Sequence, residues 1–306
     1  MFFLALLSGS LFILPVAVTI GVFLGVERQR IFSGDASTGG GGGGGGIFGL
    51  GRPKVTTDTY CQKSYGITPF PGRWGDEQDL GDLCLNITTS TATKSSEVYA
   101  AGWSVTWQYP PGSADEPVHA FPNAKLELND TIPAQLSDIK SLFLDVTWTY
   151  GLGNYIHNET NSTNLEAAGV NANVAVDMFF AKDKTNSTST TDSDYEVMVW
   201  LGRWGAAVDP IGLASGIKAN HSINGTHFSL YYGDNQNTGQ TVFTWVADQN
   251  TTSFTGDLTP LVSKLEENAG PDGKSYLGYA AFGSEALYSF ENVTFFVPRL
   301  EMDVQA

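Results

Sequence analysis

Three acidic residues lie within stretches that otherwise have the composition of a protein core. Glu196 lies in "YEVMVWLG" and Asp177 in "NVAVDMFFA", while Glu285 follows Gly283 and Ser284 in the apolar run "YAAFGSEALY". Hydrolysis of a glycosidic bond needs two carboxyl groups on opposite sides of the bond, about 5–5.5 Å apart when configuration is retained. Acids from distant strands can supply such a pair, so these three residues are the candidates for acid–base and nucleophilic chemistry.

Side-chain alternation along a strand predicts which way these acids point. Glu196 shares a face with Met198 and Trp200, and the opposite, core-facing side holds Tyr195, Val197, Val199 and Leu201. The same alternation separates Asp177 from the core-facing positions of its own strand. A carboxylate beside a large aromatic ring suits the floor of a sugar-binding cleft. The alternative, a charge on the solvated face of an edge strand, fits each acid taken singly.

The elements that position these acids are short runs of alternating or apolar residues with a period of two, separated by Gly, Pro, Asn and Asp. Runs such as "SLFLDVTWTY", "THFSLYYG" and "TVFTWVAD" are typical of strands, and their number predicts an antiparallel β-sandwich. One segment has helical spacing instead. In residues 256–270, Leu258, Leu261, Val262 and Leu265 predict a single helix packed on the sheets, ending at Gly270.

Length and charge limit the class of partner. The chain has 306 residues, with 32 acidic against 16 basic residues and a formal net charge of −16. Such a charge argues against nucleic acid or another polyanion and favours a neutral or cationic ligand. Two cysteines, Cys61 and Cys84, have no metal-site spacing and predict one disulfide. We expect a monomer that holds no metal.

The beginning of the chain differs from the rest. Residues 1–26 are predicted to be a membrane anchor or a cleaved signal, because positions 2–26 carry no charged side chain. Residues 27–54 include an unbroken glycine run and are predicted to be a flexible linker, leaving 55–306 as the catalytic domain. Nine glycosylation sequons favour an extracytoplasmic location: Asn86, Asn129, Asn158, Asn161, Asn186, Asn220, Asn224, Asn250 and Asn292.

The order of several motifs resembles glycoside hydrolase family 12. These are "TYC…WG" at 59–75, "NVAVDMFFA", "YEVMVWLGRWG", "DPIG" at 209–212, "FSLYYG", "FTGDL" and "FGSE", and they span residues 58–298. The resemblance implies an all-β jelly roll of two curved antiparallel sheets with one packed helix and an open concave cleft. It also implies a retaining endo-β-1,4-glucanase acting on cellulose-like glucan or xyloglucan, without a cofactor.

The resemblance also implies roles for individual residues. Glu196 matches the nucleophile, Glu285 the general acid/base, and Asp177 the acid that hydrogen-bonds the nucleophile. Cys61 and Cys84 match the family's N-terminal disulfide. The positions expected to contact substrate are Trp74, Trp200, Met198 and the cleft-crossing loop at Pro210. The strand tryptophans are expected to lie in the core, and Trp107 is added as the first choice among them for a substrate contact.

Two departures bear on specificity. The family's usual Gln before "FGSE" is Ala281 here, and its usual Pro and Phe after the glutamate are Ala286 and Leu287. Contacts to sugar hydroxyls are therefore expected to differ from those of typical members. The rival hypothesis is a non-catalytic glucan-binding protein, because a fold alone never establishes activity. The joint presence of Glu196 and Glu285 favours the enzyme, since a binding module needs only the aromatic residues.

Overall fold

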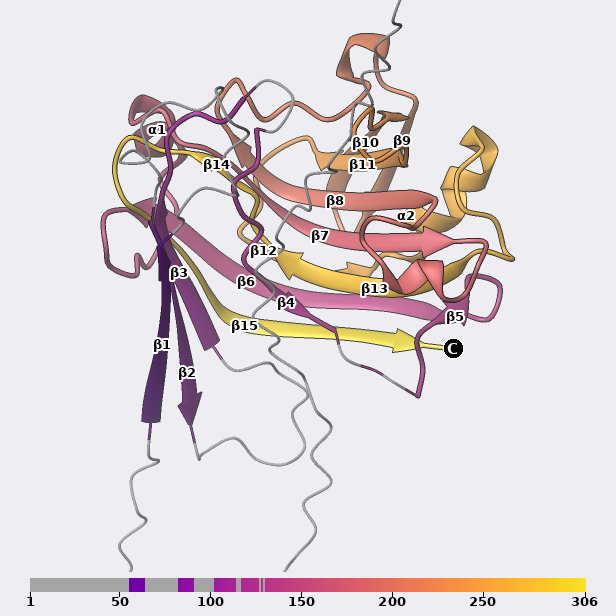
Figure 1. The fold of residues 1–306 in the computed structure, drawn as a ribbon, viewed down its shortest axis with the longest axis horizontal. Coiled ribbons are helices and arrows are strands. Elements are labelled where there is room, and N and C mark those ends of the chain that lie inside the picture. Colours follow the sequence, from indigo (N-terminus) through magenta and orange to yellow (C-terminus); the bar gives the residue numbers. More distant parts are fainter. Residues whose placement is uncertain (1–54, 64–81, 91–101, 114–116, 127, 129) are drawn as a thin grey trace, which may run out of the picture.

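The chain forms two β-sheets stacked face to face (Figure 1). A computed structural model describes residues 55–63, 82–90, 102–113, 117–126, 128 and 130–306. Within these residues strands are the dominant element, as the period-two patterns predict, and the all-β jelly-roll expectation is confirmed.

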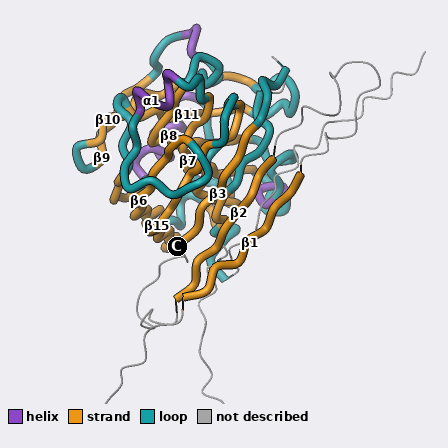
Figure 2. The backbone as a smooth tube through the Cα atoms, turned by 90° about the vertical axis from the view of Figure 1, so that its left-hand side faces the viewer, coloured by secondary structure: helices purple, strands orange, loops and turns teal. Residues whose placement is uncertain are grey.

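The first sheet has six strands, all paired antiparallel. Their order is β1 (Val55–Lys63), β2 (Asp82–Ser90), β3 (Gly102–Gln108), β15 (Val293–Gln305), β6 (Ser141–Leu152) and β12 (Ser253–Asp257). Figure 2 shows this sheet running from β1 at one edge to β6 and β15 beside the second sheet.

The second sheet has nine strands and carries the candidate acids. Its order is β4 (Asn123–Lys125), β13 (Tyr276–Gly283), β7 (Asn171–Ala181), β8 (Tyr195–Trp204), β11 (Thr241–Ala247), β10 (Thr226–Asp234) and β9 (Ala219–Ile223), with β14 (Ala286–Tyr288) beside β7 and β5 (Ala134–Gln135) beside β13. One pairing differs from the all-antiparallel expectation, because β8 and β11 run parallel. A parallel neighbour needs a long crossover connection, which the β9–β10 hairpin and its flanking loops provide here.

The hydrophobic core lies between the two sheets. Alternate residues of each strand point into it, so Val197 and Val199 of β8 meet Val146 and Trp148 of β6 within one cluster of buried side chains. The opposite face of β7 and β8 is also covered, and β7 is buried along its whole length. Strands buried on both faces have near-continuous apolar sequences, which explains why "NVAVDMFFA" contains so few polar residues.

The helical segments are short. The predicted helix is present as α2 (Thr259–Ser263), which continues as the 3-10 helix η3 (Lys264–Asn268), with Leu261, Val262 and Leu265 buried. A second helix, α1 (Ser162–Ala167), corrects the expectation of a single helix. The side chain of Asn161 accepts a hydrogen bond from the backbone N–H of Asn164 and so caps α1. Two further 3-10 turns are η1 (Asn186–Thr188) and η2 (Leu213–Ser215).

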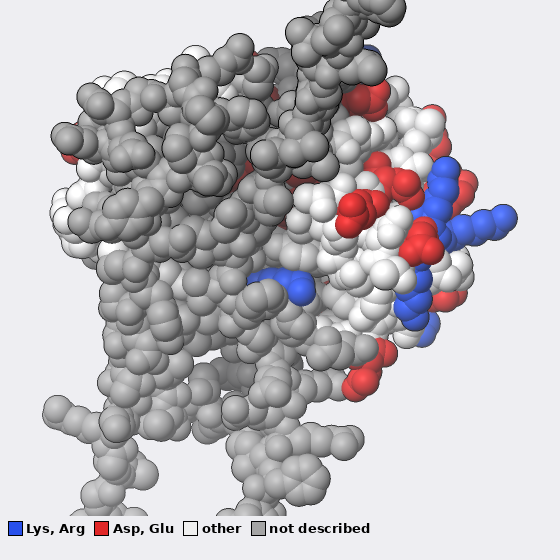
Figure 3. Space-filling model, in the orientation of Figure 1, with Lys and Arg blue, Asp and Glu red and all other residues white. Residues whose placement is uncertain are grey.

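Several N-terminal predictions fall on other parts of the chain. The apolar segment 1–26 and the linker 27–54 lie outside the described residues; in the described part, no helix has the length and apolar character needed to cross a bilayer. The backbone register of β1 and β2 places Cys61 opposite Cys84, so the strand pairing is compatible with the predicted disulfide. Acidic and basic side chains are interspersed at the right-hand edge in Figure 3.

Candidate active site

Three strands bring the predicted acids to the outer face of the nine-stranded sheet. On neighbouring strands β7 and β8, Phe179 pairs with Glu196 and Asp177 pairs with Met198, so both acids share the face opposite the core. Glu285 follows β13, which pairs with the other side of β7. Strand β7 lies between β13 and β8 and so brings together three carboxyl groups that are separated by up to 108 residues in sequence.

The three carboxyl groups are close enough to perturb one another, and their surroundings favour the protonated forms. Burial, reinforced by the charge of Glu285, raises the pKa of Glu196 to about 8. Burial raises the pKa of Glu285 to about 7, opposed by a hydrogen bond from Asn173. Burial and the charges of both glutamates raise the pKa of Asp177 well above its usual range. Like charges at such short range cannot all ionise near neutral pH, which is a common property of acid–base catalytic sites.

Asn173 holds Glu285 in place, and sequence reasoning did not identify it. Its side-chain N–H group donates to the carboxylate of Glu285, and its side-chain oxygen accepts from the backbone N–H of Glu285 at 3.0 Å. The backbone N–H of Asn173 also donates to the carbonyl of Glu285, at 3.2 Å. A sequence signal was available, since Asn173 lies four residues before Asp177 and hence on the same face of the strand.

The expected hydrogen bond between Asp177 and Glu196 is not formed in this arrangement. Asp177 Oδ1 is buried and has no hydrogen-bond partner among the described residues. Its interaction with Glu196 is electrostatic. A buried acceptor without a donor costs about 1–3 kcal/mol, so Asp177 is better accommodated in its protonated form.

Trp200 and Met198 occupy the predicted face but are buried. Only 4% of Trp200 and 7% of Met198 are exposed, and the indole N–H of Trp200 points to the sulfur of Met198 at 3.3 Å. They form a second apolar cluster with Val208, Leu287 and other side chains of this face. Trp200 therefore has little exposed surface, because side chains from a loop and from β14 cover this part of the sheet, and its contact with substrate stays a prediction.

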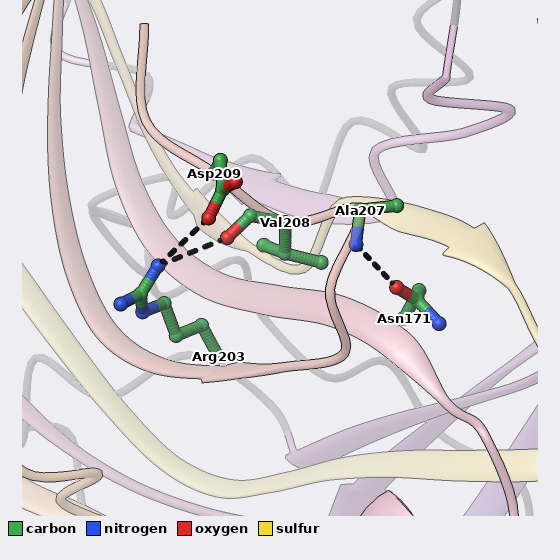
Figure 4. Close-up of polar contacts among 5 residues, drawn as sticks. All are labelled: Asn171, Arg203, Ala207, Val208 and Asp209. Atoms are coloured by element: carbon green, nitrogen blue, oxygen red, sulfur yellow. Dashed lines mark hydrogen bonds and ion pairs between the residues drawn. The ribbon is translucent and has the colours of Figure 1, made fainter. Parts of the chain in front are cut away.

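The loop that follows β8 returns across this face (Figure 4). Arg203 Nη1 donates to the carbonyl of Val208 at 3.1 Å and pairs with Asp209 at 3.5 Å, while Asn171 Oδ1 accepts from the backbone N–H of Ala207 at 2.8 Å. Val208 and Ile211 pack against the cluster that contains Trp200. The loop thus lies over the sheet, and Pro210 within it is buried; its contact with substrate stays a prediction.

Two glycines let this loop approach the sheet closely. Gly205 and Gly212 both have φ of +88°, in the left-handed region that side chains rarely adopt. A Cβ atom on Gly205 would overlap the side chain of Asn171, and one on Gly212 would overlap the carbonyl oxygen of Tyr232. The two ends of the loop are therefore fixed by glycine.

Two further predicted contacts have different outcomes. Trp107 is fully buried between the sheets, where its indole N–H donates to the hydroxyl of Tyr150 at 2.7 Å. It is a core residue and not a surface for sugar, because its strand alternation points it inward. Trp74 lies outside the described residues.

A cavity of about 410 Å³ is lined by Gly112, Ser113, Pro117, Ala207 and Tyr288, and none of the three acids is among these lining residues. Tyr288 comes three residues after Glu285, so the cavity adjoins the segment that carries this acid. Among the described residues, no group of three or more His, Cys, Asp and Glu side chains is arranged to hold a metal ion. Two interacting carboxyl groups, at least one protonated near neutral pH, provide what a double displacement requires.

Comparison with known proteins points the same way. The model of glycosyl hydrolase family 12 matches residues 70–305. Xyloglucan-specific endo-beta-1,4-glucanase A of Aspergillus niger is 32% identical over 214 residues, covering 69% of this chain and 75% of that one. The protein of the same name from Aspergillus aculeatus is 31% identical over 219 residues, covering 72% and 78%.

Two solved structures share the fold. Endoglucanase 3 of Trichoderma harzianum matches with a TM-score of 0.59 at 24% identity, covering 81% of this chain and 98% of that one. A family 12 xyloglucanase from Bacillus licheniformis matches with a TM-score of 0.56 at 16% identity, covering 81% and 100%.

Proposed function

The chain belongs to glycosyl hydrolase family 12 and is a retaining endo-β-1,4-glucanase, and from this premise we propose that Glu196 is its nucleophile, Glu285 its general acid/base and xyloglucan its main substrate. The observation that carries the proposal is that Glu285 lies close enough to Glu196 for its charge to raise the pKa of Glu196. Placing two carboxylates next to each other away from water lowers the stability of the fold. Such a pair is therefore better explained by catalysis than by a structural role.

The reaction follows from the two positions. The carboxylic acid of Glu285 donates its proton to the glycosidic oxygen as the carboxylate of Glu196 attacks the anomeric carbon. The bond from that carbon to the oxygen breaks, the leaving chain departs as an alcohol, and a glycosyl ester remains on Glu196. Glu285, now ionised, takes a proton from water, which displaces Glu196 and restores the original configuration.

The location of the proton decides which glutamate attacks. In the free site the donor on Asn173 stabilises the ionised form of Glu285, which favours the wrong protonation state for the first step. A bound substrate reverses this preference, because a glycosidic oxygen beside Glu285 can accept a hydrogen bond only from a protonated carboxyl group. Because the charge of Glu285 raises the pKa of Glu196, a proton that substrate draws to Glu285 makes it easier for Glu196 to ionise.

Asp177 has a supporting role in this proposal. Held protonated by burial and by its acidic neighbours, it can donate a hydrogen bond to Glu196 once the nucleophile ionises. That donation would stabilise the attacking carboxylate. It would also give the unpartnered Oδ1 atom of Asp177 a partner.

The substrate assignment rests on the relatives. The relatives from Aspergillus niger and Aspergillus aculeatus are both named as xyloglucan-specific enzymes. We propose that the enzyme acts outside the cytoplasm, where its polymeric substrate lies, with residues 2–26 as anchor or secretion signal. The abundant sequons agree with that location.

The test compares the wild-type chain with Glu196→Gln and Glu285→Gln on xyloglucan, carboxymethyl-cellulose and mixed-linkage β-glucan. Each variant should lose several orders of magnitude in initial rate while unfolding at a temperature no lower than the wild type, since neutral glutamine replaces a buried acid. Glu267→Gln, an exposed residue of η3, is the matched control and should keep full activity.

Three results would contradict parts of the proposal. Full activity of Glu196→Gln would remove the nucleophile assignment, and initial release of the α-anomer, followed by NMR, would remove retention. A wild-type rate that is highest on carboxymethyl-cellulose would replace xyloglucan as the main substrate. On a 2,4-dinitrophenyl cello-oligosaccharide, whose leaving group departs without a proton, the glycosyl ester can form in Glu285→Ala, and azide should restore turnover by attacking it without a general base. The absence of a glycosyl azide product from this substrate would exclude Glu285 as that base.

A further inference from the structure

The segment that carries Glu285 is held by side chains where the regular sheet is interrupted. β13 ends at Gly283 and β14 begins at Ala286, so Ser284 and Glu285 lie in the gap between two strands that both pair with β7. From the outer side, Asn173 binds Glu285. A residue inside a strand is oriented by the regular backbone hydrogen bonds of the sheet. The orientation of Glu285 depends more on individual side chains, because it lies outside such a strand.

The inner side of the same segment has its own attachment. Ser284 is fully buried and its hydroxyl lies 3.2 Å from the hydroxyl of Tyr150 on β6, in the opposite sheet. The backbone N–H of Ser284 donates to the carbonyl of Pro122, also at 3.2 Å. The Tyr150–Ser284 contact thus joins the two sheets directly behind Glu285.

Trp107 extends this contact on the side of Tyr150. The indole N–H of Trp107 can only donate, so the oxygen of Tyr150 accepts from it at 2.7 Å. The hydroxyls of Tyr150 and Ser284 share the next hydrogen bond, in which either can donate. The result is a chain of two hydrogen bonds from Trp107 through Tyr150 to Ser284, formed in a fully buried setting where hydrogen bonds are strong and costly to break.

The ring of Tyr150 cannot move to follow Ser284. It stacks on Phe295 with centroids 5.3 Å apart and contacts Trp204 at the same separation and Trp107 at 6.5 Å. Three large rings therefore fix the position of its hydroxyl. Because that hydroxyl is fixed, the hydrogen bond to Tyr150 holds Ser284 in one position. The position of the Ser284 backbone in turn limits the orientation of the next residue, Glu285.

We propose that Tyr150 is a positioning residue that holds the general acid/base Glu285 in its proton-donating orientation through Ser284. This inference rests on the proposed function of Glu285. It assigns a catalytic consequence to a residue in the centre of the core, remote from substrate. Its effect should fall on proton transfer to the leaving group and not on the attack by Glu196, which lies on β8.

The test is Tyr150→Phe in the full chain, which removes one oxygen and keeps the ring. The value of kcat/KM is measured on xyloglucan, whose sugar leaving group must be protonated, and on a 2,4-dinitrophenyl cello-oligosaccharide, whose leaving group departs without a proton. We expect a fall of about tenfold on xyloglucan, the size of one lost hydrogen bond, and a change of less than about twofold on the aryl substrate.

Two companion variants keep the experiment decisive. Ser284→Ala breaks the same contact from the other sheet and should show the same dependence on leaving group; it decides the matter if Tyr150→Phe does not fold. Thr106→Val is the matched control, because its hydroxyl bonds Thr294 at 2.8 Å and makes no contact in the Trp107–Tyr150–Ser284 chain. It should leave both substrates unaffected.

Equal falls on both substrates would overturn the proposal, since they would mean a general effect on folding or binding. No fall on xyloglucan would overturn it as well. These failures are distinct from failure of the proposed function, in which the wild-type chain itself would be inactive on all glucans.

Discussion

The unfavourable burial of Glu196 predicts that removing its charge stabilises the protein in a pH-dependent way. Burial, then the charge of Glu285, raises the pKa of Glu196 from 4.5 to about 8 in the folded chain. The folded state then binds more protons than the unfolded state between these two values. The contribution of the Glu196 carboxyl group to the stability of the folded state is complete below pH 4.5 and is lost as the pH rises through 8. Glu196→Gln has no such group to ionise.

The size of the effect follows from the pKa change. At about 1.4 kcal/mol per pKa unit, the full shift corresponds to roughly 5 kcal/mol of unfolding free energy. Because Glu196 is partly exposed and titrates together with its neighbours, we expect about 2 kcal/mol, or roughly 4–8 °C in Tm for a domain of this length. The variant should match the wild type at pH 4 and exceed it by this amount at pH 8.5.

The assay is thermal unfolding of the full chain, followed by circular dichroism at pH 4.0, 6.0 and 8.5. Glu267→Gln serves as the exposed control and should track the wild type at all three values. A Tm difference between Glu196→Gln and wild type that stays constant with pH would refute the reasoning, because it would show that the burial of this charge carries no cost.

Two further predictions concern the surroundings of the acids. Asn173→Ala removes the donor that lowers the pKa of Glu285, so the alkaline limb of the pH profile of kcat/KM should move to higher pH. The rate should also fall by roughly 100-fold, because Glu285 is no longer held in position. A limb that moves to lower pH would contradict the role of Asn173. Gly212→Ala forces a Cβ against the carbonyl of Tyr232 at positive φ and should lower the unfolding free energy by more than about 2 kcal/mol, whereas Gly225→Ala, with the same φ of +88° and no atom within 4 Å, should cost about 1 kcal/mol; equal Tm losses would show that the close approach at Gly212 is unimportant.

The sequence predicted the strands and the inner faces well, because alternation is a local property of the chain. The pattern of Val197 and Val199 against Glu196 is visible in seven consecutive letters and matches the core of the sandwich. The acids were found for the same reason, since a charge in an apolar run stands out wherever its partners lie.

The sequence was less informative where the second face of a strand is covered by residues far away in the chain. Trp200 is on the predicted side of β8 but is buried by Val208 and Leu287, and no local pattern reports that a loop returns over it. Asn173 was missed because its partner is 112 residues away. Helix α1 was missed because Asn161, read as part of a glycosylation sequon, is also the cap of that helix.

The position of strand β15 (Val293–Gln305) has a consequence for biosynthesis. Phe295 pairs with Val105 on one side and with Tyr150 on the other, so β15 is the junction that connects β1, β2 and β3 to β6 and β12. A chain emerging from the ribosome holds both halves of the six-stranded sheet long before the strand that joins them exists. The two halves of this sheet cannot pair through β15 until that strand has been made, and folding dominated by pairings between residues far apart in sequence is slow. Until β15 has been synthesised, the edges of β3 and β6 that pair with it have no partner strand.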